Sequence, residues 1–169
     1  MTNIYATSLR TSLAGALRVG DVGTHVRLGG WVHRTRNLGG LVFVDLRDRT
    51  GIVQVSVDPN RTSADVCAAA AALGNETVVL IEGDVARRPE TMRNPDMETG
   101  DVEVIATSVR VVGPAETPAI PVARGKGEKL AAEDLRLRHR YLDLRRPELQ
   151  ENLVLRHRLL QETRRHLSE

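Results

Sequence analysis

The chain has 169 residues, 27% of them charged, and a formal net charge of only +2. This length is enough for one well-packed domain with a smaller appendage. The net charge does not by itself identify a nucleic-acid-binding protein, and the single cysteine, Cys67, rules out a disulfide framework or a cysteine metal site within the chain. We expect a cytoplasmic protein without membrane contact, because no stretch approaches membrane-spanning length and the N-terminus lacks the apolar core of a signal peptide.

Three segments near the start of the chain alternate apolar and polar residues with the period of a half-buried strand. They span residues 25–33, 41–47 and 52–57. A polar loop, residues 34–40, separates the first two, and residues 48–51 predict a tight turn. The residues expected to face inward are Val26, Leu28 and Val32 in the first strand, Val42, Val44 and Leu46 in the second, and Val53, Val55 and Val57 in the third.

An alanine-rich stretch, residues 62–73, predicts one short helix. Thr62 or Ser63 is the candidate N-cap, because a side-chain oxygen there accepts a hydrogen bond from a free backbone N–H. Gly74 is the candidate C-terminal stop. Cys67 lies within this helix and is expected to be buried and inert.

Two further strands are predicted at residues 77–88 and 101–112, and a change of phase near Thr107 indicates a β-bulge. Three strands, a helix and two strands is the order of an oligonucleotide/oligosaccharide-binding (OB) fold. We therefore predict a mainly β protein, a five-stranded OB-fold Greek-key barrel with one short helix between strands 3 and 4. The pattern alone also fits other small β-barrels.

The rest of the chain is rich in proline and glycine and then becomes helical. Residues 134–146 are basic and amphipathic, and Pro147 suits the first turn of a C-terminal helix. The expected organisation is a barrel domain over residues 1–112, a linker or hinge over residues 113–133, and the incomplete start of another domain over residues 134–169.

The outer face of the predicted barrel carries an unusual set of side chains. Phe43, the only phenylalanine, points away from the core, and Gln54, Arg88 and Glu103 do the same on other strands. An apolar ring among hydrogen-bonding groups suits an unpaired base, since stacking on an aromatic residue contributes about 1–3 kcal/mol. Gln, Glu and Arg can then read the base edges.

Basic residues follow at the end of the first strand. His33, Arg34 and Arg36 are placed to hold phosphates, but the two arginines are equally compatible with solvated loop charges. An outward Phe43 is also compatible with a ring covered by a loop or by another domain. Trp31, on the same face, is expected to pack beneath the N-terminal segment rather than to form a second platform. No carboxylate pair, nucleophile–base set or metal-ligand spacing predicts catalysis or metal binding.

Three stretches resemble one known family. Residues 29–55 closely resemble the anticodon-binding barrel of bacterial-type aspartyl-tRNA synthetases, and residues 96–104 (DMETGDVEV) also look like that family. The sequence YLDLRRP at residues 141–147 resembles the segment between its hinge and the first class II motif. The resemblance covers nearly the whole chain. It implies an anticodon-binding domain, a hinge and the start of a class II catalytic domain, in which residues 147–169 look like a helix that contributes to a dimer interface.

The resemblance also implies roles for individual residues. Phe43 matches the aromatic residue that stacks on an anticodon base. Asn37 stands where many members carry aspartate, so this chain departs from them beside the recognition loop. The positions associated with anticodon recognition are Arg36, Gln54, Arg88 and Glu103.

Finally, the resemblance implies a parent enzyme. That enzyme would activate aspartate with ATP and Mg²⁺, transfer it to tRNA-Asp and act as a homodimer. We expect no catalysis, cofactor or metal within these 169 residues, whose partner would be the anticodon stem-loop. Two alternatives remain: a stand-alone OB module that binds single-stranded nucleic acid with little sequence preference, and a structural fragment whose outward phenylalanine packs on a partner protein.

Overall fold

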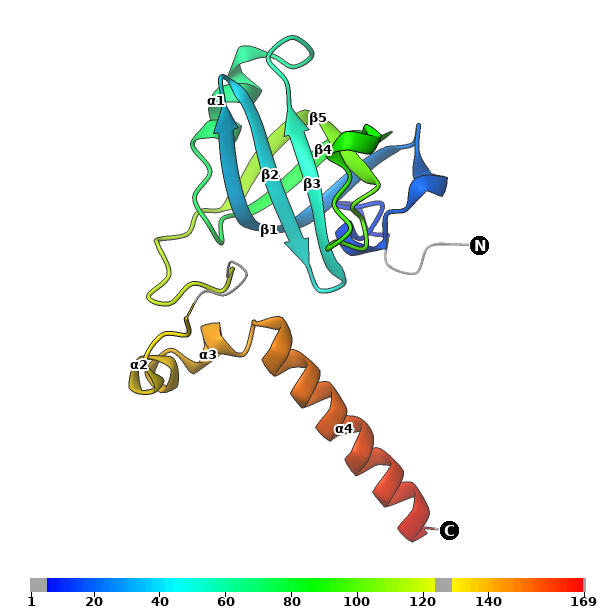
Figure 1. Ribbon diagram of the computed structural model, residues 1–169, viewed down its shortest axis with the longest axis vertical. Helices are drawn as coiled ribbons and strands as arrows, with labels where there is room; N and C mark the ends of the chain where they lie inside the picture. Colours follow the sequence, from blue (N-terminus) through cyan, green and yellow to red (C-terminus); the bar gives the residue numbers. More distant parts are fainter. Residues whose placement is uncertain (1–5, 124–128, 169) are drawn as a thin grey trace. The chain divides into compact units, whose positions relative to one another are not determined.

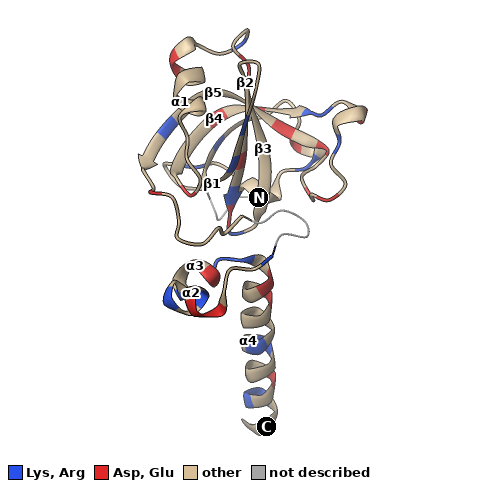
Figure 2. Cartoon of the chain, turned by 60° about the vertical axis from the view of Figure 1, so that its left-hand side comes forward, with Lys and Arg blue, Asp and Glu red and all other residues tan. Residues whose placement is uncertain are grey.

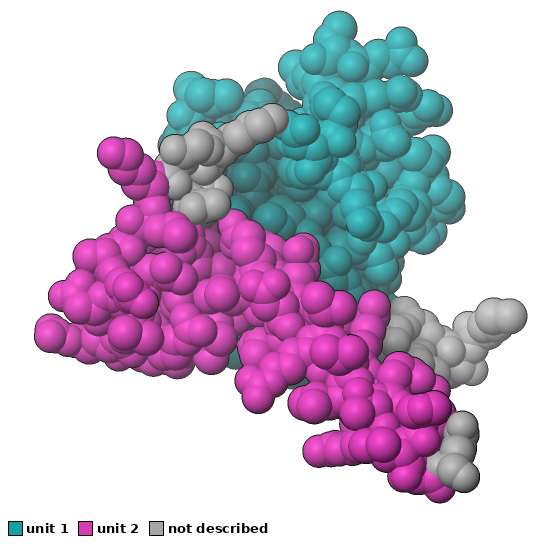
Figure 3. Space-filling model, turned by 60° about the horizontal axis from the view of Figure 1, so that its bottom comes forward, with its two compact units in different colours: residues 1–117 teal, residues 118–169 magenta. Residues whose placement is uncertain are grey.

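The computed structural model describes residues 6–123 and 129–168. The chain divides into two compact units, residues 1–117 and residues 118–169 (Figure 3). Acidic and basic residues occur in both units (Figure 2). Within the described ranges, no helix is both long and apolar enough to cross a membrane.

Unit 1 is built around a closed five-stranded barrel (Figure 1). The strands pair in the order β1-β2-β3-β5-β4, and β4 pairs back onto β1. All pairs are antiparallel except β3 with β5, which run parallel. This topology confirms the predicted five-stranded OB-fold barrel. The strands are β1 (His25–Leu38), β2 (Leu41–Asp48), β3 (Gly51–Val57), β4 (Val78–Arg87) and β5 (Val102–Gly113).

The barrel interior is aliphatic. Every residue predicted to face inward on the first three strands is buried, and so are Val79, Ile81 and Val85 on β4. Burial of one such side chain stabilises the fold by about 1.5–3 kcal/mol. Because successive strand residues point to opposite sides, this packing fixes which side chains remain on the outer wall.

Helix α1 (Ala64–Ala71) lies between β3 and β4, as predicted. Ser63 occupies the N-cap position with an extended backbone, but its side chain forms no capping hydrogen bond. The prediction that Gly74 stops the helix is wrong. Ala72 is the C-cap, and the Gly74 carbonyl accepts a hydrogen bond from the Thr77 N–H (3.3 Å) in the following turn. Cys67 is half-buried against the barrel core rather than fully buried.

The first hairpin differs from the prediction. Residues 34–38, expected to form a loop, continue β1 and pair with β2, so that only Gly39 and Gly40 form the turn. Both glycines have positive φ angles, 63° and 97°, which suits a two-residue hairpin turn of type I′. The extension was missed because residues 33–38 are mostly polar and lack the apolar alternation used to recognise a strand.

Three irregularities change the register of the barrel: two on β5, at Thr107 and at Val112, and one on β1. On β5, Ser108 and Ala106 face consecutive residues of β4, which leaves Thr107 as the extra residue and confirms the predicted phase change. On β1, Val32 pairs with Leu46 and Arg34 with Asp45, so His33 is the extra residue. The sequence analysis did not predict the bulge on β1.

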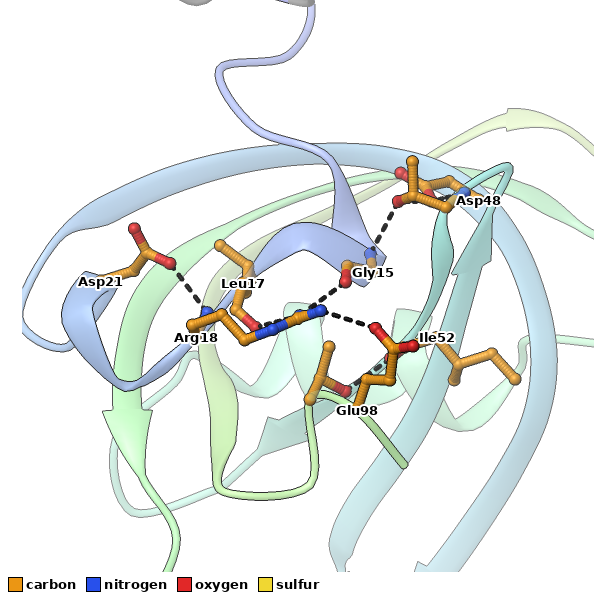
Figure 4. Close-up of polar contacts among 9 residues, drawn as sticks. Gly15, Leu17, Arg18, Asp21, Asp48, Ile52 and Glu98 are labelled. Atoms are coloured by element: carbon orange, nitrogen blue, oxygen red, sulfur yellow. Dashed lines mark hydrogen bonds and ion pairs between the residues drawn. The ribbon is translucent and has the colours of Figure 1, made fainter. Parts of the chain in front are cut away.

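Short segments occupy both ends of the barrel. The 3-10 helix η1 (Ala14–Ala16) meets the β2–β3 turn, where the Ala14 N–H donates to Asp48 (2.7 Å) and the Gly15 N–H to Thr50 (3.1 Å). Arg18 holds this segment through the carbonyls of Gly15 and Leu17 and through Glu98 (2.6 Å), as Figure 4 shows. At the other end, α1 packs against β2, β3 and β5. Two further 3-10 helices are η2 (Val19–Asp21) and η3 (Glu90–Met92).

Unit 2 contains α2 (Glu133–Arg138), α3 (Arg140–Asp143) and α4 (Pro147–Ser168). Its small apolar cluster joins Leu142 to Ile120 and Val122, which lie in the segment expected to be a linker. The Asp143 carboxylate is fully buried and contacts three guanidinium groups, those of Arg136, Arg140 and Arg146. Helix α4 begins at Pro147, as predicted, and is exposed along most of its length.

Candidate nucleic-acid interface

Phe43 lies on the outer wall of β2. Its ring is partly exposed, whereas its neighbours Val42 and Val44 point into the core. Arg36 pairs with Phe43 across the β1–β2 ladder, and the Arg36 Cζ lies 5.7 Å from the centre of the ring. A cation at this distance from a ring face forms a cation–π contact. The ring is therefore an apolar surface on the wall with a guanidinium above it.

A chain of hydrogen bonds runs beside the ring. Arg36 Nη2 donates to Asp45 Oδ1 (2.9 Å) and to Gln54 Oε1 (3.2 Å). Gln54 Nε2 donates in turn to Glu103 Oε2 (3.1 Å). These contacts join β1, β2, β3 and β5 in one polar strip. Gln54 is on the outer wall, as predicted, but only 6% of it is exposed.

The bulge at His33 accounts for the position of Arg36. Before the bulge, the even-numbered residues of β1 point inward, and Val32 is the last of them. The extra residue reverses this alternation, so Thr35 faces inward opposite Val44 while Arg34 and Arg36 face outward. If His33 instead took a paired place in a regular ladder, Arg36 would point inward and would not share a face with Phe43.

A second polar cluster surrounds Arg47. This residue is on the outer wall of β2, yet its side chain is only 10% exposed. Its Nη2 donates to both carboxylate oxygens of Glu76 at 2.8 Å, and its Nη1 lies 3.0 Å from His33 Nδ1. Burial, followed by the charge of Arg47, lowers the pKa of His33 below 6.5, although Asp45 and Glu76 oppose this shift.

The other predicted site residues take different positions. Arg34 is exposed and pairs with Asp45 across the ladder. Asn37 Oδ1 accepts a hydrogen bond from the Gly40 N–H (3.1 Å) and so braces the hairpin turn. Arg88 follows β4, and its backbone N–H donates to the Asp101 carbonyl (2.9 Å). Arg88 is thus near the start of β5, but no hydrogen bond or ion pair joins it to the polar strip within the described residues.

Three members of these clusters were not among the predicted site residues: Asp45, Arg47 and Glu76. Strand alternation placed Asp45 and Arg47 on the outer face, but it did not reveal that Asp45 binds Arg36 and that Arg47 binds His33. Glu76 gave no sequence signal, because it lies in a turn with a φ of 66°. Trp31 is half-buried beside Arg47 in the ladder, and its expected packing beneath the N-terminal segment stays a prediction.

Comparison with known families shows which family this barrel belongs to. Residues 26–112 match the tRNA anticodon family model, which is described as an OB-fold nucleic acid binding domain. The chain belongs to this family. The match spans the barrel from β1 to the end of β5, including the polar strip, and bears out the resemblance seen in the sequence.

Relatives of this OB-fold nucleic acid binding domain are aspartate–tRNA ligases. The chain is 51% identical over 168 residues to an aspartate–tRNA(Asp/Asn) ligase of Rubrobacter xylanophilus, covering 99% of this chain and 26% of the ligase. It is 45% identical to that of Syntrophotalea carbinolica, covering 100% of this chain and 28% of the ligase. The chain therefore spans about a quarter of the length of these curated relatives.

Solved structures share the fold. An asparaginyl-tRNA synthetase from Pyrococcus horikoshii superposes with a TM-score of 0.71 at 28% identity and covers 91% of this chain and 36% of that one. An aspartyl-tRNA synthetase from Entamoeba histolytica has a TM-score of 0.72 at 23% identity, which shows likeness of fold alone, over 83% of this chain and 33% of that one. In the part of the chain that the structure describes, no group of three or more His, Cys, Asp or Glu residues could hold a metal ion.

Proposed function

We propose that this OB-fold nucleic acid binding domain binds the anticodon loop of tRNA-Asp, with Phe43 as the stacking platform. The observation that carries the proposal is the partly exposed Phe43 ring beside the chain of hydrogen bonds from Asp45 through Arg36 and Gln54 to Glu103. Proteins that read single-stranded RNA stack unpaired bases on such rings and bond to the base edges with neighbouring polar groups.

The hydrogen bonds also orient the Gln54 amide. Arginine only donates and a carboxylate only accepts, so the oxygen of the amide faces Arg36 and its nitrogen faces Glu103. The amide keeps one further lone pair on Oε1 and one further N–H on Nε2. Gln54 can therefore offer an acceptor and a donor in fixed directions to a base that lies on Phe43. This arrangement selects a base edge with the complementary pattern.

Arg36 contributes to the same surface. Its side chain is 45% exposed and lies over the Phe43 ring before RNA is bound. Because planar guanidinium groups stack on bases as aromatic rings do, an incoming base meets two stacking groups at this point. Arg34, exposed on the same wall, supplies positive charge for the phosphate backbone.

The proposal is tested by titrating the chain with the anticodon stem-loop of tRNA-Asp. Phe43→Ala should weaken binding by about 1–3 kcal/mol, the usual contribution of one base–aromatic stack. Val111→Ala is the matched control, because Val111 is an exposed apolar residue at the opposite end of β5 from Glu103. Unchanged affinity of the Phe43→Ala chain would contradict the platform assignment.

A scrambled loop at the same salt concentration separates this function from tolerant single-strand binding. We expect the anticodon loop to bind more tightly than the scrambled loop. Equal affinity, with a steep dependence on salt, would favour a sequence-tolerant module. Absence of binding at any salt would favour a structural fragment whose phenylalanine contacts a protein.

We further propose that the chain acts as part of an aspartate–tRNA ligase that uses ATP and Mg²⁺, acts as a homodimer and works in the cytoplasm. The support is the similarity to aspartate–tRNA(Asp/Asn) ligases over nearly all of this chain. The chain itself would supply RNA binding and not catalysis. Incubation with ATP, Mg²⁺, aspartate and tRNA-Asp should give no aspartyl-tRNA, and its formation by these residues alone would overturn this assignment.

A further inference from the structure

His33 connects the buried pair Arg47–Glu76 to the outer wall. Arginine has several N–H groups and no acceptor, so in the contact of 3.0 Å between Arg47 Nη1 and His33 Nδ1 the arginine donates, and Nδ1 accepts the hydrogen bond and carries no proton of its own. A neutral imidazole has one proton, which must then be on Nε2. Within the described residues, nothing forms a hydrogen bond with this Nε2.

The surroundings of His33 lower its pKa, so they favour this neutral form. Arg34 on the same strand and Arg47 on β2 disfavour a second proton, whereas Asp45 on β2 and Glu76 from the segment before β4 favour it. Burial is the largest influence and, with Arg47, lowers the pKa of the ring. The pKa of His33 therefore lies below 6.5, and the neutral form predominates at pH 7.

The backbone fixes the same cluster. The Glu76 N–H donates to the Val32 carbonyl (2.7 Å), and the Val32 N–H donates to the Thr77 carbonyl (2.9 Å), so the segment before β4 is tied to β1 next to the bulge. Glu76 has a φ of 66°, a left-handed conformation that is uncommon for a residue other than glycine. Such conformations persist only where the surroundings impose them, and they are frequent at functional sites.

We propose that Arg47 and Glu76 are positioning residues that hold His33 as a neutral Nε2–H donor, and that this donor binds an acceptor atom of an unpaired nucleotide, a base carbonyl or a ribose hydroxyl, beside Phe43. The inference rests on the proposed RNA-binding function. His33 is the bulge residue immediately before Arg34, and Asp45 faces Arg34 across the ladder and also binds Arg36 of the polar strip. This role replaces the phosphate contact that the sequence suggested for His33.

The tautomer and the charge of the His33 ring can be tested without RNA. Long-range ¹H–¹⁵N spectra of the intact chain distinguish the two histidine tautomers and follow the titration of each ring. We expect His33 to carry its proton on Nε2 at pH 7 and to titrate with a midpoint below 6.5. A proton on Nδ1, or a midpoint at or above 6.5, would contradict the inference that His33 is held as a neutral Nε2–H donor.

The salt dependence of RNA binding tests the donor. A cationic contact with a single-stranded phosphate contributes about 0.7 to the slope of log K against log salt. His33→Ala should lower affinity about two- to tenfold, the range for one net hydrogen bond, and leave this slope unchanged. Arg34→Ala is the matched control and should reduce the slope by about 0.7. A reduced slope for His33→Ala would show a phosphate contact and overturn the inference.

A double-mutant cycle tests the positioning role. Replacement of a buried ion pair by apolar residues of similar volume is often neutral for stability, so Arg47→Met with Glu76→Leu should fold, as circular dichroism and urea unfolding can verify. RNA affinity should fall about two- to tenfold in the presence of His33 and should not fall further in a His33→Ala background. Equal losses of RNA affinity in both backgrounds would show that Arg47 and Glu76 have a merely structural role. This result would overturn the inference about His33 but not the proposed RNA-binding function. If the wild-type chain binds no RNA, the proposed function and the donor role both fall.

Discussion

Deletion of His33 should leave the barrel folded, because His33 is the one residue of β1 without a partner in β2 at the bulge. Val32 already pairs with Leu46, and Arg34 with Asp45, so removal of His33 joins two pairs into a regular ladder. All later residues of β1 keep their partners and their faces. The main loss is the hydrogen bond from Arg47, about 1.5–3 kcal/mol for a bond with a charged donor.

Deletion of Thr35, two residues further on, is the matched comparison. Thr35 faces inward opposite Val44, a fully buried residue. If the bulge absorbs this deletion, Arg34 moves into the inward position, and an unpaired charge is buried at a cost of several kcal/mol. If the bulge persists, the pairing of residues 36–38 with β2 must shift by one residue, which turns each of their side chains to the other face.

Urea unfolding followed by circular dichroism measures both effects from the midpoint and the slope. We expect the chain without His33 to lose about 1.5–3 kcal/mol and to retain cooperative unfolding. We expect the chain without Thr35 to lose more than about 3 kcal/mol or to fail to fold. Similar losses of unfolding free energy for the two deletions, or a greater loss for the His33 deletion, would refute the explanation that the bulge at His33 determines which of the following β1 residues face outward.

Further predictions concern close packing and charge in the two units. Gly83→Ala should destabilise the barrel by about 1–3 kcal/mol, because the added Cβ would collide with the backbone carbonyl of Ile105. In the control Gly20→Ala the added Cβ meets open space, so stability should change by less than about 0.5 kcal/mol. Equal urea midpoints for the two variants would contradict this prediction. In unit 2, the hydrogen bond from Arg136 holds the pKa of Asp143 below 3.8. A depressed carboxyl pKa stabilises the folded state above pH 3.8, and this contribution is lost as the pH falls through the lower, folded pKa. Protection of amides 133–146 from exchange should accordingly be lower in Asp143→Asn than in the wild type at pH 7, and equal protection would argue against a role for the carboxylate.

The strands and the inner faces of the barrel could be predicted because burial imposes a strict period of two on aliphatic residues. The same period revealed the Thr107 bulge, where apolar residues on both sides show the change of phase. At His33 the following residues are polar, so no change of phase was visible. A bulge between polar residues leaves no trace in a pattern that is read from hydrophobicity.

The candidate site was predicted in part. Strand alternation placed Phe43, Gln54 and Glu103 on the outer wall, and the structure joins Gln54 to Glu103. Sequence could not show that Arg36 lies over the ring, because that requires the bulge and the extended strand. It also could not show the contact between Arg47 and Glu76, since residues 29 positions apart meet only when the α1–β4 segment returns to β1.

The blocked ends of the barrel have a consequence for how such a domain can change its ligand. Because η1 packs at one end of the barrel and α1 at the other, the proposed recognition would use the wall rather than the aliphatic interior. Substitutions there alter what is recognised without disturbing the packing that keeps the strands in place. A new preference can therefore be engineered by exchanging a few wall residues, with the folding of the scaffold left intact.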